Sequence, residues 1–235
     1  MFDFSNQVAI VTGGSGNLGR VVVRALHAAG ANLVVPDRTR GRMQSLFPDL
    51  ADAADHYLVE GVDVTQFGAM EQVVGDTLKR FGQIDILVNT IGGYRAGMPV
   101  YETLPETWDM MLNVNARTVF YACRAIIPTM LERGQGKIVN VGARSALVGG
   151  PNEAAYSASK SAVARLTESL AAEIKQHGVN VNAVLPAAMI TPEQRQAEPD
   201  SGVTPEEVTE IIMFLCSKSA GVIHGALIPA FGTHF

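Results

Sequence analysis

The stretch QVAIVTGGSGNLG, residues 7–19, joins a short apolar run to a glycine-rich turn and then to the start of a helical pattern. Gly14, Gly16 and Gly19 satisfy the spacing GxGxxG, which is weak alone and much stronger after a first strand. Glycines let the backbone approach a diphosphate, and the following helix offers free N–H groups and the positive end of its dipole. The stretch predicts a dinucleotide-binding turn, with candidate contacts at Gly13, Ser15, Gly16, Asn17, Leu18 and Gly19.

Outward from this turn, short runs rich in valine and isoleucine alternate with longer stretches of helical periodicity. Several runs are apolar on both faces, which is typical of strands buried in a parallel sheet. Strands are predicted at 7–12, 32–36, 56–62, 84–89, 137–141, 179–185 and 225–230, and helices at 18–29, 40–53, 66–80, 105–132, 152–177 and 205–217. The alternation predicts an α/β fold in one domain, 1–235: a doubly wound, Rossmann-type parallel sheet of about seven strands with helices on both faces. Residues 186–203, with three prolines and no clear period, are predicted to form a substrate loop or lid.

The composition suits a globular domain, with 47% hydrophobic and 17% charged residues. A net charge of −5 gives no general attraction to nucleic acid or anionic lipid, and no apolar run approaches the roughly 18 residues of a membrane span. The N-terminus lacks the basic region of a signal peptide, and Cys123 and Cys216 have no CxxC spacing, so a cytoplasmic setting is expected. The five histidines are scattered, and we expect no metal site.

The end of the second strand carries a signal for the type of dinucleotide. Asp37 follows Gly19 by 18 residues, and a carboxylate there accepts hydrogen bonds from both ribose hydroxyls but repels a 2′-phosphate. This favours NAD. Arg38, Arg40 and Arg42 could pair with a phosphate, so NADP stays open. Asp63 ends the third strand, where it could bind the adenine amino group or only shape a turn.

Tyr156 and Lys160 stand four positions apart in the string YSASK, which puts both on one face of a helix. The same helix is rich in alanine, valine and leucine on most of its surface. A helix with so few polar positions is mostly buried, and its polar residues are expected to have a task. The pair is therefore a candidate proton-transfer site.

These motifs together resemble the short-chain dehydrogenase/reductase family over nearly the whole chain. The strings that carry the likeness are TGGSGNLG (12–19), DVT (63–65), NTIGG (89–93), LNVNA (112–116), YSASK (156–160) and NAVLP (182–186), together with Asp37. The resemblance implies an NAD(P)(H)-dependent oxidoreductase that acts on a small molecule, with Tyr156 as general acid/base, Lys160 as its electrostatic partner and Asn115 holding a water relay to Lys160. It also implies cofactor contacts at Asp37, Arg38, Asp63, Val64, Asn89, Gly92, Pro186, Met189 and Thr191, and a homodimer or homotetramer through the helices 105–132 and 152–177.

One departure from the family pattern bears on the chemistry. The family's catalytic serine lies thirteen residues before the tyrosine, and that position is Ala143. Such a serine donates a hydrogen bond to the substrate oxygen, which alanine cannot do. Another donor could replace it, and the candidates are Arg144, Ser145, Tyr94 and Arg95.

Alternatively, the substrate reacts without a hydrogen bond from a residue at position 143. The strings VGARSAL and AVLPAAMITPEQR resemble dihydropteridine reductase and its bacterial relatives, in which the Tyr–Lys pair stands without the serine. That resemblance implies a quinonoid ring such as a dihydropterin as hydride acceptor. The expected function is therefore hydride transfer between nicotinamide and a small carbonyl, alcohol or quinonoid ring. The alternative is a catalytically silent, dinucleotide-binding sensor or scaffold.

Overall fold

Seven strands form one parallel sheet in the order β3-β2-β1-β4-β5-β6-β7. The computed structural model describes residues 2–51, 53–197 and 201–232, and the other residues lie outside this description. The strand order reverses between β1 and β4, and the carboxyl ends of two such strands form the usual binding crevice of this architecture. The strands are β1 (Val8–Thr12), β2 (Asn32–Asp37), β3 (His56–Glu60), β4 (Ile86–Asn89), β5 (Gly136–Val141), β6 (Val179–Pro186) and β7 (Leu227–Ala230).

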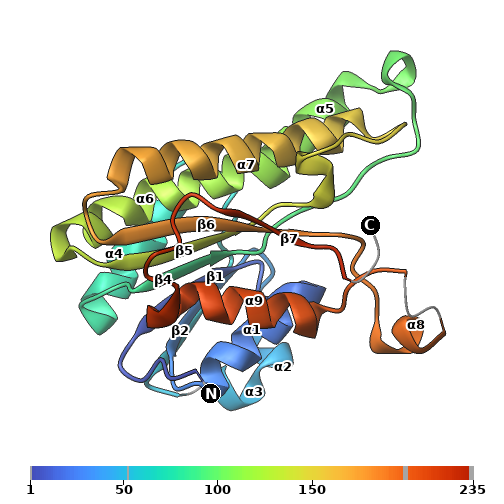
Figure 1. Ribbon diagram of the computed structural model, residues 1–235. Helices are drawn as coiled ribbons and strands as arrows, with labels where there is room; N and C mark the ends of the chain where they lie inside the picture. Colours follow the sequence, from blue (N-terminus) through green and yellow to red (C-terminus); the bar gives the residue numbers. More distant parts are fainter. Residues whose placement is uncertain (1, 52, 198–200, 233–235) are drawn as a thin grey trace.

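Helices cover both faces of the sheet (Figure 1). One face carries α1 (Asn17–Ala28), α2 (Arg42–Leu46), α3 (Pro48–Ala51) and α9 (Pro205–Cys216), and the other carries α4 (Ala69–Phe81), α6 (Thr118–Arg133) and α7 (Ala154–Ile174). Successive strand residues point to opposite faces, so Ala9 and Val11 join one buried core while Val8 and Ile10 join the other. The predicted fold class is confirmed.

Three predicted segments differ in detail. The helix expected at 40–53 is two short helices, because the chain leaves helical geometry at Phe47 and Pro48 opens the next turn; its residue 52 lies outside the described residues. The helix expected at 105–132 is α5 (Pro105–Met111), a π-helical turn η2 (Leu112–Arg117) and α6. The predicted loop 186–203 contains a short helix, α8 (Pro192–Ala197), and its residues 198–200 are not among those described.

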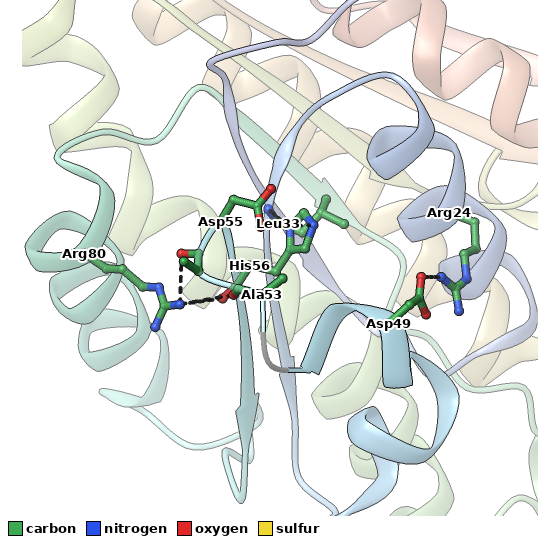
Figure 2. Close-up of polar contacts among 8 residues, drawn as sticks. Arg24, Leu33, Asp49, Ala53, Asp55, His56 and Arg80 are labelled. Carbon is green, nitrogen blue, oxygen red and sulfur yellow. Dashed lines mark hydrogen bonds and ion pairs between the residues drawn. The ribbon is translucent and has the colours of Figure 1, made fainter.

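His56 pins β3 to β2 at the edge of the sheet (Figure 2). Its ring is buried, and Nδ1 accepts the backbone N–H of Leu33 over 3.2 Å. On the other side, Arg80 donates to the carbonyl oxygens of Ala53, Ala54 and His56. Burial lowers the pKa of His56, since a charged ring would lose hydration there. A neutral histidine therefore helps to hold the strand that leads to the binding crevice.

None of the described helices is long and apolar enough to cross a membrane. Within the same part of the chain, no group of three or more His, Cys, Asp or Glu side chains is placed to hold a metal ion. Cys123 and Cys216 are free and buried, one in each of the two cores.

Candidate active site

The glycine turn after β1 is closely packed against its own backbone and against β4. Gly13 has φ +75°, and a Cβ on Gly19 would lie 2.1 Å from the Gly13 carbonyl oxygen. The N–H of Gly16 donates to the same oxygen over 2.9 Å, and Gly16 is the residue before α1. A side chain at Gly19 would therefore push the turn apart. The start of α1 is open to an anion in the way expected for a phosphate-binding turn.

A pocket of about 260 Å³ lies beside this turn and runs along the ends of β2, β3 and β4. It brings together eight of the predicted cofactor residues: Gly13, Ser15, Gly16, Asp37, Arg38, Asp63, Val64 and Gly92. It also contains Arg42, one of the arginines expected to be able to pair with a phosphate, and residues that were not predicted as contacts, namely Pro36, Val62, Thr65, Thr90, Ile91 and Val114. Thr90 and Ile91 directly follow β4, one of the two strands between which the strand order reverses. The rule that ligands bind at the carboxyl ends of such strands could alone have located these two residues.

Asp37 and two arginines occupy the same end of this pocket. The Asp37 carboxylate is nearly buried, and its Oδ1 accepts the N–H of Thr39 over 2.7 Å. Arg38 and Arg42 both line the pocket, whereas the Arg40 guanidinium lies against Gly61. The pocket therefore offers an acceptor for ribose hydroxyls and two cations close to it.

Asp63 is held in a turn and also lines the pocket. Desolvation opposes ionisation of this carboxyl, but hydrogen bonds from the backbone N–H and hydroxyl of Thr65 outweigh it and lower the pKa of Asp63. The nearby Arg38 acts in the same direction. Both interpretations of Asp63 therefore remain compatible with its position, because the turn bonds use Oδ1.

Asn89 and Leu18 are among the predicted cofactor residues that do not line the pocket, and both are buried. Asn89 is 1% exposed, accepts from the Thr12 hydroxyl and donates to Asn140 Oδ1 over 2.9 Å, so it joins three neighbouring strands internally. Leu18 is buried in the core below α1. Both side chains point into the interior, so a contact of either residue with a cofactor would come from its backbone. Asn17 lies at the start of α1, where it accepts from Arg20.

The π-helical turn η2 places Asn115 between the loop after β4 and α7. Asn115 is 0% exposed; its Oδ1 accepts the N–H of Gly93 over 2.9 Å, and its Nδ2 donates to the Gly93 carbonyl and to Ser159 Oγ. Ser159 Oγ in turn donates to the Tyr156 carbonyl over 2.7 Å. The Asn115 side chain is thus a rigid bracket between the pocket wall and the helix that carries the tyrosine. Ser159 was not predicted, although it is a polar residue on an apolar helix three positions after Tyr156.

Lys160 is buried behind Gly92, a residue that lines the pocket, with 4% of its surface exposed. Its Nζ donates to the Val141 carbonyl over 3.0 Å, and a Cβ on Gly92 would lie 3.1 Å from Nζ and 3.0 Å from Asn115 Oδ1. Burial lowers the pKa of Lys160 to about 8. The amine therefore reaches the pocket wall at Gly92, and an ammonium group has three N–H donors of which Val141 takes one.

Tyr156 is half-buried one turn before Lys160. Burial raises the pKa of Tyr156 to about 12, and Glu153 and Tyr94 act in the same direction. Desolvation is the largest cause of this shift, and it favours the protonated phenol. The rings of Tyr94 and Tyr156 meet edge to face, with centroids 4.8 Å apart and planes at 84°.

The position of the missing hydroxyl lies in an extended segment directly after β5. Ala143 is 7% exposed with φ −163° and ψ 164°, and the short turn η3 (Arg144–Ala146) follows it. Arg144 is exposed, with its guanidinium 5.7 Å from the Phe231 ring centroid, and Ser145 is half-buried. Arg95 lines a further pocket of about 250 Å³ with Glu153, at the amino end of α7.

The predicted lid begins where β6 ends at Pro186. Its two described ends are tied together, because Ile190 N–H donates to the Val203 carbonyl and Val203 N–H donates to the Ala188 carbonyl, both over 2.9 Å. Met189 and Thr191 do not line the pocket that contains Asp37. They face an open pocket of about 720 Å³ that Asn17 on α1 also lines.

Comparison with known proteins agrees with this geometry. Residues 7–202 match the family model described as short chain dehydrogenase. The 3beta-hydroxysteroid dehydrogenase 2 of Eggerthella lenta is 31% identical over 245 residues (97% of this chain, 94% of the relative), and the 2-(R)-hydroxypropyl-CoM dehydrogenase of Xanthobacter autotrophicus is 31% identical over 246 (97% and 98%). The crystal structure of gox2181 superposes with a TM-score of 0.88 at 31% identity, covering 97% of this chain and 95% of that one. The chain therefore belongs to the short chain dehydrogenase family of NAD(P)-dependent oxidoreductases.

Proposed function

We propose that this protein is an NADH-preferring enzyme that transfers hydride between the nicotinamide and a small carbonyl or alcohol, with Tyr156 as the proton donor or acceptor. The observation that carries the proposal is the buried Lys160 amine, which lies at the pocket wall beside Gly92 and one helical turn from the phenol. Burial of a charged amine costs free energy, because the amine loses its hydration. A lysine with a purely structural role would avoid this cost by keeping its amine in solvent.

The residues of the pocket fit a dinucleotide. The turn before α1 offers N–H groups to the diphosphate, Asp37 accepts from the adenine-side ribose, and Lys160 has donors left for the nicotinamide-side ribose. The bound nicotinamide supplies the hydride. Tyr156, neutral at pH 7 because of its raised pKa, gives its proton to the substrate oxygen during reduction. Asn115 holds the two walls of this site together and is a positioning residue.

Asp37 supports NAD over NADP. Its Oδ1 bond to Thr39 fixes the carboxylate at the end of β2, where a 2′-phosphate would meet a negative charge. Arg38 and Arg42 weaken this discrimination, because both guanidinium groups line the same pocket.

A carbonyl or alcohol is the favoured substrate class because both relatives named above are named as dehydrogenases of hydroxy compounds, a 3beta-hydroxysteroid and 2-(R)-hydroxypropyl-CoM. Ala143 favours a second candidate, a quinonoid ring of the dihydropterin type. Such a ring accepts hydride readily and needs less polarisation than an isolated ketone.

Exposed apolar side chains on α5 and α6, among them Trp108, Met110 and Phe120, support a homodimer or homotetramer.

A turnover survey tests the proposal. NADH oxidation is followed at 340 nm with cyclohexane-1,2-dione, a naphthoquinone and quinonoid dihydropterin, each against a blank without enzyme. We expect turnover with at least one acceptor and loss of that turnover in Tyr156→Phe. The control variant Tyr101→Phe, which changes an exposed side chain in the short 3-10 helix η1 (Val100–Glu102), should keep the wild-type rate. Tight NADH binding without turnover on any acceptor would instead support a silent dinucleotide-binding protein, and activity retained in Tyr156→Phe would refute the proton role.

A further inference from the structure

We propose that Tyr94 supplies the hydrogen-bond donor that position 143 lacks, so that two phenols, Tyr156 and Tyr94, hold the substrate oxygen. This role rests on the proposed reaction. Tyr156 transfers its proton to the oxygen as hydride reaches the carbon and the C=O electron pair moves onto the oxygen. The Tyr94 proton stays on Tyr94 and only stabilises the developing charge.

The first support is contact between the two rings. Tyr94 and Tyr156 meet edge to face at 4.8 Å, which is a favourable geometry for aromatic pairs. Tyr94 nevertheless remains 64% exposed, so its side chain is not buried in the protein core. A large aromatic side chain on an open loop that rests on the proton donor is placed to touch whatever binds there.

The second support is the way the Tyr94 backbone is fixed. The residue before it, Gly93, is bound at both its N–H and its carbonyl by the buried Asn115 side chain, which also binds Ser159 on the tyrosine helix. Farther along the same loop, the N–H of Gly97 donates to the Asn152 carbonyl over 2.8 Å. The loop that carries Tyr94 is thus tied through Asn115 to Ser159, which follows Tyr156 on α7, and directly to Asn152, which precedes it. A donor held in this way costs little reorganisation when the substrate binds.

The other candidate donors are less well placed. The Arg144 side chain is exposed and lies over the Phe231 ring. Arg95 lines a pocket that Glu102 and Glu153 also line and that does not contain Tyr156. Ser145 is half-buried on η3 and shows no ring or hydrogen-bond contact with Tyr156 among the described residues.

Steady-state kinetics with the best acceptor of the survey test this role in four variants. Tyr94→Phe keeps the ring and removes the hydroxyl, and we expect kcat to fall at least about tenfold, the scale of one hydrogen bond to a developing charge. Tyr101→Phe is the matched control, and Ser145→Ala tests the competing donor; both should stay within about twofold of wild type on the same scale. In the double variant Tyr94→Phe/Ala143→Ser, the new hydroxyl should restore most of the lost kcat.

The outcomes separate this role from a structural one and from failure of the proposed function. NADH affinity and the midpoint of thermal unfolding should be unchanged in Tyr94→Phe, because the ring contact is retained. Wild-type kcat in Tyr94→Phe would overturn the inference while leaving the proposed function intact. A loss of kcat in Ser145→Ala, with none in Tyr94→Phe, would assign the donor to Ser145. Absence of turnover in the wild type would overturn both.

Discussion

Replacement of Asn115 by alanine is expected to destabilise the protein through one localised set of lost contacts. The side chain makes three hydrogen bonds to nitrogen or oxygen partners, at 2.9 Å and 3.1 Å to the Gly93 N–H and carbonyl and at 2.9 Å to Ser159 Oγ, and a weaker one at 3.9 Å to Met111 Sδ. A typical net contribution is about 1 kcal/mol for each, and partners left unpaired in a buried place cost more. Gly93 is partly accessible and can be hydrated in the variant, whereas Ser159 is buried. We therefore expect a loss of about 2–4 kcal/mol in the free energy of unfolding.

Asn113→Ala is the matched control on the same π-helical turn. Asn113 is half-buried, and its Oδ1 accepts one exposed bond from Arg117 over 3.1 Å, so its removal should cost about 0.5 kcal/mol or less. Equilibrium urea unfolding, followed by circular dichroism, measures both variants. In a domain of this size the difference corresponds to roughly 5–15 °C in the midpoint of thermal unfolding. Equal stabilities of the two variants would refute the view that Asn115 is a bracket.

Three further outcomes follow from the pocket and the sheet edge. Asp37→Ser should raise the preference for NADPH over NADH at least about tenfold, because the repelling charge goes and two arginines remain; an unchanged ratio of the two dissociation constants would count against the cofactor assignment. NADH affinity should fall as pH rises through about 8, where Lys160 loses its proton, and should be flat between pH 7 and 9 in Lys160→Met; fluorescence titration tests this. His56 has a lowered pKa in the folded state, so the unfolded chain binds more protons. Stability should be full above pH ~6.5 and fall below it, with a slope of at most about 1.4 kcal/mol per pH unit from this group. In His56→Gln, urea unfolding between pH 7 and 5 should show a shallower slope, and an equal slope would contradict this origin.

The sheet was predictable because its signal is local. Runs such as those of β1 and β5 are buried on both faces, and valine and isoleucine fill both. The start of α9 is likewise determined locally, because Thr204 and Glu207 lie three positions apart and form a capping box. The π-helical turn at 112–117 could not be predicted from the sequence, because helical periodicity continues through it. Only the contacts that Asn115 makes outside the helix explain it.

The site divides in the same way. The spacing of Tyr156 and Lys160 places them on one helix face without any knowledge of the rest of the chain. Asn89 is the last residue of β4 and Thr90 follows it, yet the Asn89 side chain points into the interior and Thr90 lines the pocket. That difference depends on alternation along β4 and on partners from β1 and β5, which lie far away in the sequence. The contact between Tyr94 and Tyr156 likewise exists only through tertiary structure.

The opposite pKa shifts of Tyr156 and Lys160 have one cause, which is burial, and they determine the protonation states of the two groups at neutral pH. Burial favours the neutral form of both groups, so it raises the pKa of the phenol to about 12 and lowers that of the amine to about 8. At neutral pH the chain's own groups therefore present a protonated phenol beside a charged amine, which is the state that gives a proton to a carbonyl oxygen. Alcohol oxidation starts from the deprotonated phenol, which Glu153 and Tyr94 disfavour further. In the proposed reaction, this protonation state fits Tyr156 as the group that donates a proton to a carbonyl oxygen.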